Sequence, residues 1–131
     1  MTPLFTAEVL GNLPSMKNQR RIITNRRTGK PMSIKSESAM EYEASFLAQI
    51  ARNRTKLPLD STIPLSLKAR VWYKSRRNDL DIEFLKDLLQ KSGVVENDRQ
   101  FVHQEAWKGL DRENPRVCFS IHRALVEVED G

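Results

Sequence analysis

Residues 62–90 read TIPLSLKARVWYKSRRNDLDIEFLKDLLQ, and this stretch predicts a strand followed by a helix. Apolar and polar residues alternate from Ile63 to Tyr73, which is the period of a half-buried strand. From residue 82 the apolar spacing changes to three and four, which indicates an amphipathic helix that ends at Ser92 and Gly93. The residues predicted to be buried on this helix are Ile82, Leu85, Leu88 and Leu89.

The rest of the chain supplies further strands and one more helix. We expect strands at residues 4–10, 101–108 and 116–126, and a helix from Ser36 or Ser38 to about Arg52. The buried stripe predicted for that helix consists of Met40, Ala44, Leu47 and Ala51, widened by Phe46 and Ile50. At 131 residues the chain is expected to form one domain over 1–131. The order of elements predicts an α+β fold, a mostly antiparallel mixed sheet with two main helices packed against it.

Composition excludes several classes of protein. With 39% hydrophobic and 30% charged residues, the chain is expected to be globular rather than disordered. No apolar run approaches the roughly 20 residues of a membrane span, and the N-terminus lacks the features of a signal peptide. Cys118 is the single cysteine, which rules out an internal disulfide and a cysteine-based zinc site. We therefore expect a cytoplasmic protein with no membrane partner.

Positive charge is concentrated near the N-terminus. Residues 1–36 carry a net charge of +6, against +5 for the whole chain. The basic residues of this segment are Lys17, Arg20, Arg21, Arg26, Arg27, Lys30 and Lys35. A turn-forming stretch at 25–29 predicts a basic loop or hairpin at about 14–36. Such a patch is typical of a polyanion-binding protein, although a solvated loop has the same composition; an active site nearby would favour nucleic acid.

Two aspartates stand where the central strand gives way to the helix. Asp79 and Asp81 have two interpretations: they cap the helix N-terminus, or they hold a metal ion. Mg²⁺ prefers oxygen ligands, usually carboxylates together with water and phosphate. If residues 79–81 are extended, both side chains project to one side, and a loop that returns towards the helix start would bring Asp98 close. Glu83 and Glu96 are further candidate ligands.

Lys86 has a similar pair of interpretations. Asp79, Glu83 and Lys86 are four and three residues apart, so they share one face if the helix begins early. A lysine aimed at the site would neutralise charge developing on a phosphate or on its leaving oxygen. In the alternative, Lys86 is a surface partner of Glu83.

Three motifs in order resemble the RusA-type Holliday-junction resolvases. They are GNLPSMKN at 11–18, RRNDLD at 76–81 with the helix that carries Lys86, and GVVENDRQ at 93–100. The family has an opening G-x-P-P-S-x-N loop with a basic tail, an R-x-D-x-D signature, a helix with a lysine, and an acidic pair followed by Gln. Each motif is weak by itself, but together they cover most of the chain between Gly11 and Lys108.

The resemblance implies a function and assigns roles to residues. Members are small homodimers that bind four-way DNA junctions and use Mg²⁺, for which Mn²⁺ can substitute, to nick two strands symmetrically. Asp79, Asp81 and Asp98 would be the catalytic, metal-binding carboxylates, and Lys86 the catalytic or phosphate-contacting lysine. Arg76, Arg77 and the basic N-terminal segment would bind DNA phosphates. No small-molecule substrate is implied.

The chain departs from the family pattern at four places. Ile82 stands where the family usually has Asn, and Lys86 falls one residue further along than usual. The interval to the acidic loop is somewhat shorter, and Asn97 replaces the first acid of the acidic pair. These differences make Glu83 a possible substitute ligand.

Three other functions fit parts of the pattern. A restriction-type nuclease needs Glu-x-Lys on a strand, but two residues separate Glu83 from Lys86 in a predicted helix. A topoisomerase-primase-like fold also uses D-x-D, with a parallel sheet and a Glu near the first strand, for which Glu8 is the one candidate. A non-catalytic junction-binding protein of the same fold is the alternative from another class, and Mg²⁺-dependent cleavage separates it from a nuclease.

Overall fold

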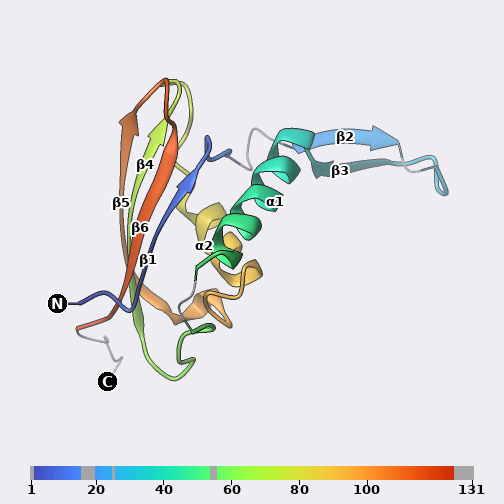
Figure 1. Ribbon diagram of the computed structural model, residues 1–131. Coiled ribbons are helices and arrows are strands. Elements are labelled where there is room, and N and C mark those ends of the chain that lie inside the picture. The colour runs from blue at the N-terminus through green and yellow to red at the C-terminus, as the bar shows by residue number, and fades with distance from the viewer. Residues whose placement is uncertain (1, 16–19, 25, 54–55, 126–131) are drawn as a thin grey trace, which may run out of the picture.

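The computed structural model describes residues 2–15, 20–24, 26–53 and 56–125 and confirms the predicted α+β class. A four-stranded mixed sheet has the order β1-β6-β4-β5, and a separate two-stranded sheet pairs β2 with β3 (Figure 1). The elements are β1 (Phe5–Leu10), β2 (Arg20–Thr24), β3 (Pro31–Lys35), α1 (Glu37–Ala51), β4 (Leu65–Tyr73), α2 (Ile82–Lys91), the 3₁₀ helix η1 (Asp98–Gln100), β5 (Phe101–Leu110) and β6 (Arg116–Arg123).

Strand β4 is the centre of the sheet. It pairs with β6 in the antiparallel and with β5 in the parallel orientation. Its alternation is as the sequence predicts, because the side chains of Leu65, Leu67, Ala69, Val71 and Tyr73 are at most 1% exposed. Since β5 is parallel to β4, the chain must cross from the end of β4 to its beginning, and α2 makes that crossing. The loop at 74–81 and the start of β5 therefore lie at opposite ends of β4.

Both helices pack on the same face of the sheet (Figure 1). On α2 the buried residues are Phe84, Leu85, Leu88 and Leu89, so the predicted apolar face is confirmed except that Ile82 is only partly buried. On α1 the predicted burial of Phe46 and Ile50 is confirmed. The stripe of Met40, Ala44, Leu47 and Ala51 is wrong, because Met40 is 44% exposed and the other buried residues are Ala39 and Tyr42. The two aromatic rings bury more apolar area than Met40 and the alanines, so they set which face of α1 turns inward.

The outer edge of β1 is covered by a side chain of α1. The Leu10 N–H donates to Oε1 of Gln49 at 2.8 Å, and Nε2 of Gln49 donates to the Leu10 carbonyl at 3.0 Å. The amide thus takes the place that a further strand would occupy, which protects this edge from pairing with another chain.

The basic segment forms a hairpin rather than an irregular loop. Strands β2 and β3 pair in the antiparallel orientation, from Arg20 opposite Lys35 to Thr24 opposite Pro31. Gly29 has a φ of 70°, a left-handed conformation that glycine adopts at little cost. The hairpin extends away from the sheet beyond α1 (Figure 1). Lys17 lies outside the described residues.

The second face of the four-stranded sheet is covered by neither α1 nor α2 (Figure 1). We call it the open face; it consists of the side chains of β1, β6, β4 and β5 that point away from the helices. Arg116 lies over the ring of Trp72 at 4.1 Å, and Arg70 lies 5.6 Å from the ring centroid of Trp107. Cys118 also lies here, half-buried, with its Sγ 3.4 Å from Oε2 of Glu8.

Candidate functional site

The loop at 74–81, which carries both aspartates of the D-x-D motif, is held first by Tyr73. This tyrosine is the last residue of β4 and is completely buried. Its hydroxyl donates a hydrogen bond to the backbone carbonyl of Asp79 at 2.9 Å. Burial raises the pKa of Tyr73 to about 12, so the hydroxyl keeps its proton at neutral pH and remains a donor. The core strand thereby fixes the backbone at the first aspartate.

The N-terminal motif holds the other end of the same loop. The Lys74 N–H donates to Oδ1 of Asn12 at 2.9 Å, although the two residues are 62 positions apart. Asn12 lies in the segment 11–15, which is anchored by the buried residues Leu13 and Ser15. Gly11 has a φ of 119°, and a Cβ there would lie 3.3 Å from the ring of Tyr42. This position therefore favours glycine for its backbone conformation.

A lysine from the neighbouring strand β5 makes a third contact with the loop. The Nζ of Lys108 donates to the Arg76 carbonyl at 3.0 Å and lies 5.9 Å from the ring centroid of Tyr73. Three separate parts of the chain thus hold residues 74–81: β4 through Tyr73, the segment 11–15 through Asn12 and β5 through Lys108.

Asp81 is the N-cap of α2. Its Oδ1 accepts a hydrogen bond from the Phe84 N–H at 2.9 Å, so the capping interpretation holds for this residue. Capping does not exclude metal binding, because a carboxylate has about four lone-pair sites on two oxygens. Asp79 is exposed and Asp81 is half-buried, two residues apart on an anchored loop. This pair provides the hard oxygen donors that Mg²⁺ prefers.

Lys86 forms an ion pair with Glu83. The distance from its Nζ to Oε1 of Glu83 is 2.9 Å, and the Lys86 side chain is 14% exposed against 72% for Glu83. The surface-partner interpretation therefore describes the structure as it stands. A pair with so exposed a partner contributes only about 0–1 kcal/mol, so a phosphate could replace Glu83 at small cost.

Asp98 lies beside the last turn of α2 and not beside its first. The Asp98 N–H donates to Oε1 of Gln90 at 2.9 Å, and Gln90 follows Asp81 by nine residues, or about 13 Å along a helix axis. The cause is the parallel orientation of β5, which brings the chain back at the far end of β4. Among the described residues, no group of three or more Asp, Glu, His or Cys side chains is close enough to hold a metal ion.

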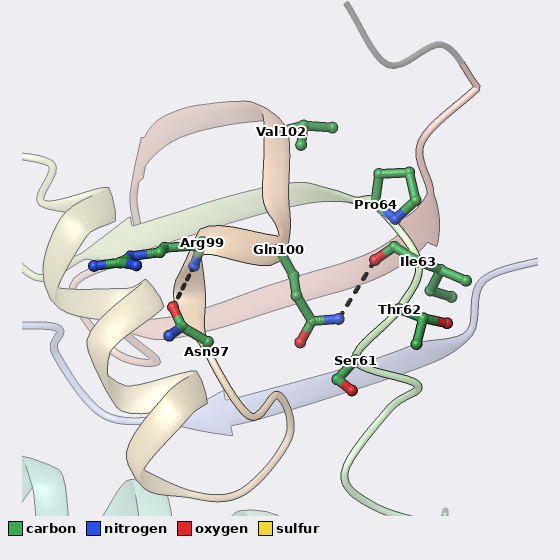
Figure 2. A pocket seen from close by; sticks show the side chains of 8 residues that line it. All are labelled: Ser61, Thr62, Ile63, Pro64, Asn97, Arg99, Gln100 and Val102. Atoms are coloured by element: carbon green, nitrogen blue, oxygen red, sulfur yellow. Dashed lines mark hydrogen bonds between the residues drawn. The ribbon is translucent and has the colours of Figure 1, made fainter.

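A pocket of about 370 Å³ lies near Asp98, at the end of the sheet where β4 and β5 begin. Figure 2 shows Gln100 among the lining residues, with its Nε2 donating to the carbonyl of Ile63 at 3.4 Å. The same Nε2 also donates to the carbonyl of Asp60 at 2.9 Å. Its lining consists of Ser61, Thr62, Ile63, Pro64, Asn97, Arg99, Gln100 and Val102. Asp79 and Asp81 are not among these residues, so the pocket and the D-x-D loop are separate features.

The candidate DNA-binding residues fall in two places. Arg76 and Arg77 are exposed on the loop at 74–81, directly before Asp79. Arg26, Arg27 and Lys30 are exposed at the tip of the hairpin, and Arg20 and Arg21 lie on β2. The structure thus places two of these bases on the same loop as the carboxylates.

Sequence reasoning did not identify Asn12, Tyr73 or Lys108 as part of the site. Asn12 belonged to a recognised motif, but its partner Lys74 is distant in the sequence. Tyr73 fitted the alternation of a core strand, which gives no sign that its hydroxyl contacts a loop. Lys108 reaches the helix side of the sheet because the β4–β5 register shifts between Leu65 and Ser66. Such a bulge cannot be predicted from a local sequence pattern.

Comparisons with known proteins assign the chain to no family. No protein-family model matches the chain, and a comparison with curated proteins gives no match either. Within the part of the chain that the structure describes, no helix is long and apolar enough to cross a membrane.

Proposed function

We propose that this protein is a Mg²⁺-dependent, structure-selective endonuclease that resolves four-way DNA junctions by paired, symmetric nicks, similar to the RusA-type resolvases. The observation that carries the proposal is the hydrogen bond between Lys74 and Asn12. It joins the GNLPS motif to Lys74, the first residue of the loop that contains RRNDLD, so two motifs of the resemblance are in contact across 62 positions of sequence.

The carboxylates of Asp79 and Asp81 are the proposed metal ligands. Asp98, to which the resemblance also gives a catalytic role, lies beside Gln90 at the other end of α2 and does not join this pair within one chain. Mg²⁺ is commonly held by one or two protein carboxylates together with water and substrate phosphate, so the pair on one loop fits this ion, and Mn²⁺ has similar preferences. When bound, the metal supplies activation of a water molecule and stabilisation of the leaving oxygen. Tyr73 and Asn12 keep the ligand-bearing loop in place.

The basic residues are proposed to bind the DNA backbone. Arg76 and Arg77 would position a phosphate next to the carboxylates, and Lys86 would exchange Glu83 for that phosphate. The hairpin bases Arg20, Arg21, Arg26, Arg27 and Lys30, together with Lys17, would contact phosphates further from the cut. Their neutralising effect makes the affinity strongly dependent on salt concentration.

The open face is the surface that we assign to the homodimer. Acidic residues stand on the two outer strands, Glu8 on β1 and Glu105 on β5, and basic residues stand on the two inner strands, among them Lys68 and Arg70 on β4. Two copies stacked with an offset of one strand would set β5 of each copy, which carries Glu105, opposite β6 of the other, which carries Arg116, while β4 faces β4. With the twofold axis along the strands, both loops at 74–81 lie at one end of the dimer, matching the twofold symmetry of a junction. The proposed location is the cytoplasm.

The test is cleavage of a labelled four-way junction and of a matched linear duplex, with Mg²⁺ and with chelator. Asp81→Asn is the informative variant, because asparagine is as good an N-cap as aspartate and so keeps α2 intact. We expect symmetric nicks in the junction alone, lost with chelator and in Asp81→Asn, while junction binding is retained. The matched control is Asp87→Asn, which removes one acidic charge from an exposed position of the same helix and should still cut.

One other function is favoured by a specific observation. Asp81 caps a helix and Asp98 lies about a helix length away, which suits a non-catalytic junction-binding protein of the same fold. Tight junction binding in chelator with no cutting in Mg²⁺ or Mn²⁺ would establish that alternative. A chain that cuts linear duplex as fast as the junction would contradict both.

A further inference from the structure

We propose that Lys108 is a positioning residue of the site, which holds the loop at 74–81 in the conformation that presents Asp79 and Asp81. This inference rests on the proposed function, because that function is what makes the loop a metal-binding site. The contact between Lys108 and the loop does not depend on the proposed function. Lys108 belongs to none of the three motifs of the resemblance that define the site.

The parallel orientation of β5 puts Lys108 at the correct end of the sheet. Lys108 is paired with Val71, two residues before the end of β4, and so lies next to the point where the loop begins. After the register shift at the start of the strand, its side chain points to the helix side, where Leu110 and Ala106 also point. An antiparallel β5 would carry the same residue to the other end of β4.

The contacts of Lys108 form a chain that ends at Asp79. Its ammonium donates to the Arg76 carbonyl at 3.0 Å and lies 5.9 Å from the ring centroid of Tyr73. The hydroxyl of the same ring donates to the Asp79 carbonyl at 2.9 Å. The loop is thus held at residue 76 from β5 and at residue 79 from β4. Residue 76 lies in a turn in which the Arg77 N–H donates to Oγ of Ser75 at 3.2 Å.

A lysine at this position is electrostatically unfavourable unless negative charge lies nearby, which suggests a role at the proposed site. Arg76 and Arg77 place two further positive charges on the same loop, and like charges repel. The arrangement is favourable once negative charge is present, and Asp79, Asp81 and a DNA phosphate supply it. An interaction that only stabilised the fold would be served by a neutral donor, whereas a cation here also attracts the phosphate of a bound DNA strand.

The experiment compares the native chain with Lys108→Met, Lys108→Arg and the matched control Lys56→Met, an exposed loop lysine. Methionine keeps a long apolar stem without a donor or charge, and arginine keeps both. Three quantities are measured: hydrogen exchange of the backbone amides at 74–81 without metal, the Kd for Mn²⁺ by electron paramagnetic resonance, and kcat and KM for junction cleavage in Mg²⁺.

For Lys108→Met we expect faster hydrogen exchange at the amides of Arg77 and Asn78. We also expect Mn²⁺ binding to weaken by about 10- to 100-fold and kcat to fall by a similar factor. This is the size of effect seen when outer-shell partners of metal ligands are removed. KM should change little, because the residue acts through the loop and not on the DNA. Lys108→Arg should recover most of each quantity, and Lys56→Met should match the native chain. If Lys108→Met does not fold, Lys108→Gln, which retains a shorter donor without the charge, takes its place.

The outcomes separate the two proposals. Native exchange rates at 74–81 in Lys108→Met overturn the positioning role, whatever the activity. Faster exchange in Lys108→Met with unchanged Mn²⁺ affinity and kcat would show that Lys108 holds the loop but that this contact does not affect metal binding or cleavage. A native chain that neither binds Mn²⁺ nor cuts overturns the proposed function instead, and the exchange rates still decide whether Lys108 holds the loop.

Discussion

At the scale of single residues, close packing on the open face depends on one glycine. Gly109 in β5 lies opposite Trp72 in β4, and an added Cβ would lie 2.8 Å from Cδ1 and 2.9 Å from Nε1 of that indole. Arg116 of β6 lies over the face of the same ring and is held by Asp111 at 2.9 Å. The indole therefore has little freedom to move away.

We predict that Gly109→Ala destabilises the fold by about 1–3 kcal/mol, the usual cost of overpacking. Denaturant unfolding measures the change, and a double-mutant cycle locates its cause. In a Trp72→Ala background the same substitution should cost less than half as much, because the clashing ring is gone. An equal cost in both backgrounds would show that the strand backbone, and not the indole, resists the added methyl group.

At the scale of elements, the two sheets occupy different positions in the fold. The four-stranded sheet and both helices form the core, whereas the hairpin of β2 and β3 extends beyond α1 and presents Arg26, Arg27 and Lys30 to solvent. A basic element that extends away from the four-stranded sheet is suited to binding a polyanion. Its contribution should therefore appear in affinity rather than in stability.

Replacing Arg26, Arg27 and Lys30 with glutamine should weaken junction binding and reduce its salt dependence. The slope of log K against log salt should become shallower by about 0.9 for each phosphate that the variant no longer neutralises. Fluorescence anisotropy in chelator at several salt concentrations measures the slope. The control neutralises three exposed bases elsewhere, Lys56, Arg112 and Arg123, and should leave the slope nearly unchanged. Equal effects of both triple variants would mean that net charge, and not the hairpin, determines affinity.

At the scale of the whole molecule, symmetric cutting requires two sites in a fixed relation. The open face has charges of both signs, and Trp107 on it is 47% exposed. On the opposite side of the molecule, Met40 of α1 is 44% exposed. These two residues offer a matched comparison of two candidate dimer surfaces.

Trp107→Glu should convert the proposed dimer to a monomer, because it removes a large exposed ring from the proposed contact and adds an acidic group next to Glu105 on the same strand. Light scattering measures the mass, and a cruciform plasmid assay reports whether the two nicks are made together. We expect single, uncoordinated nicks from the monomer, while Met40→Glu should remain dimeric and cut in pairs. Loss of the dimer in Met40→Glu alone would place the interface on the helix side.

The sequence by itself determined the elements that local periodicity controls. The alternation from Ile63 to Tyr73, the helix with Leu85 and Leu88, and its end at Gly93 all depend on neighbours within a few residues. The α+β class followed from the order of these elements. The same local rules placed Phe46 and Ile50 correctly but put Met40, and not Tyr42, on the buried face of α1. Several faces of that helix carry apolar residues, and contact with Phe84, which is distant in the sequence, selects Tyr42.

Only the tertiary structure decided how the candidate site is assembled. Whether β5 runs parallel or antiparallel to β4 depends on pairing between distant residues, which no local pattern encodes. That orientation sets Asp98 beside Gln90 and brings Lys108 to the loop of Asp79. The hydrogen bonds of that loop to Asn12 and Tyr73 likewise form only when the core has closed. Short-range patterns fix the elements, and long-range packing fixes which side chains meet.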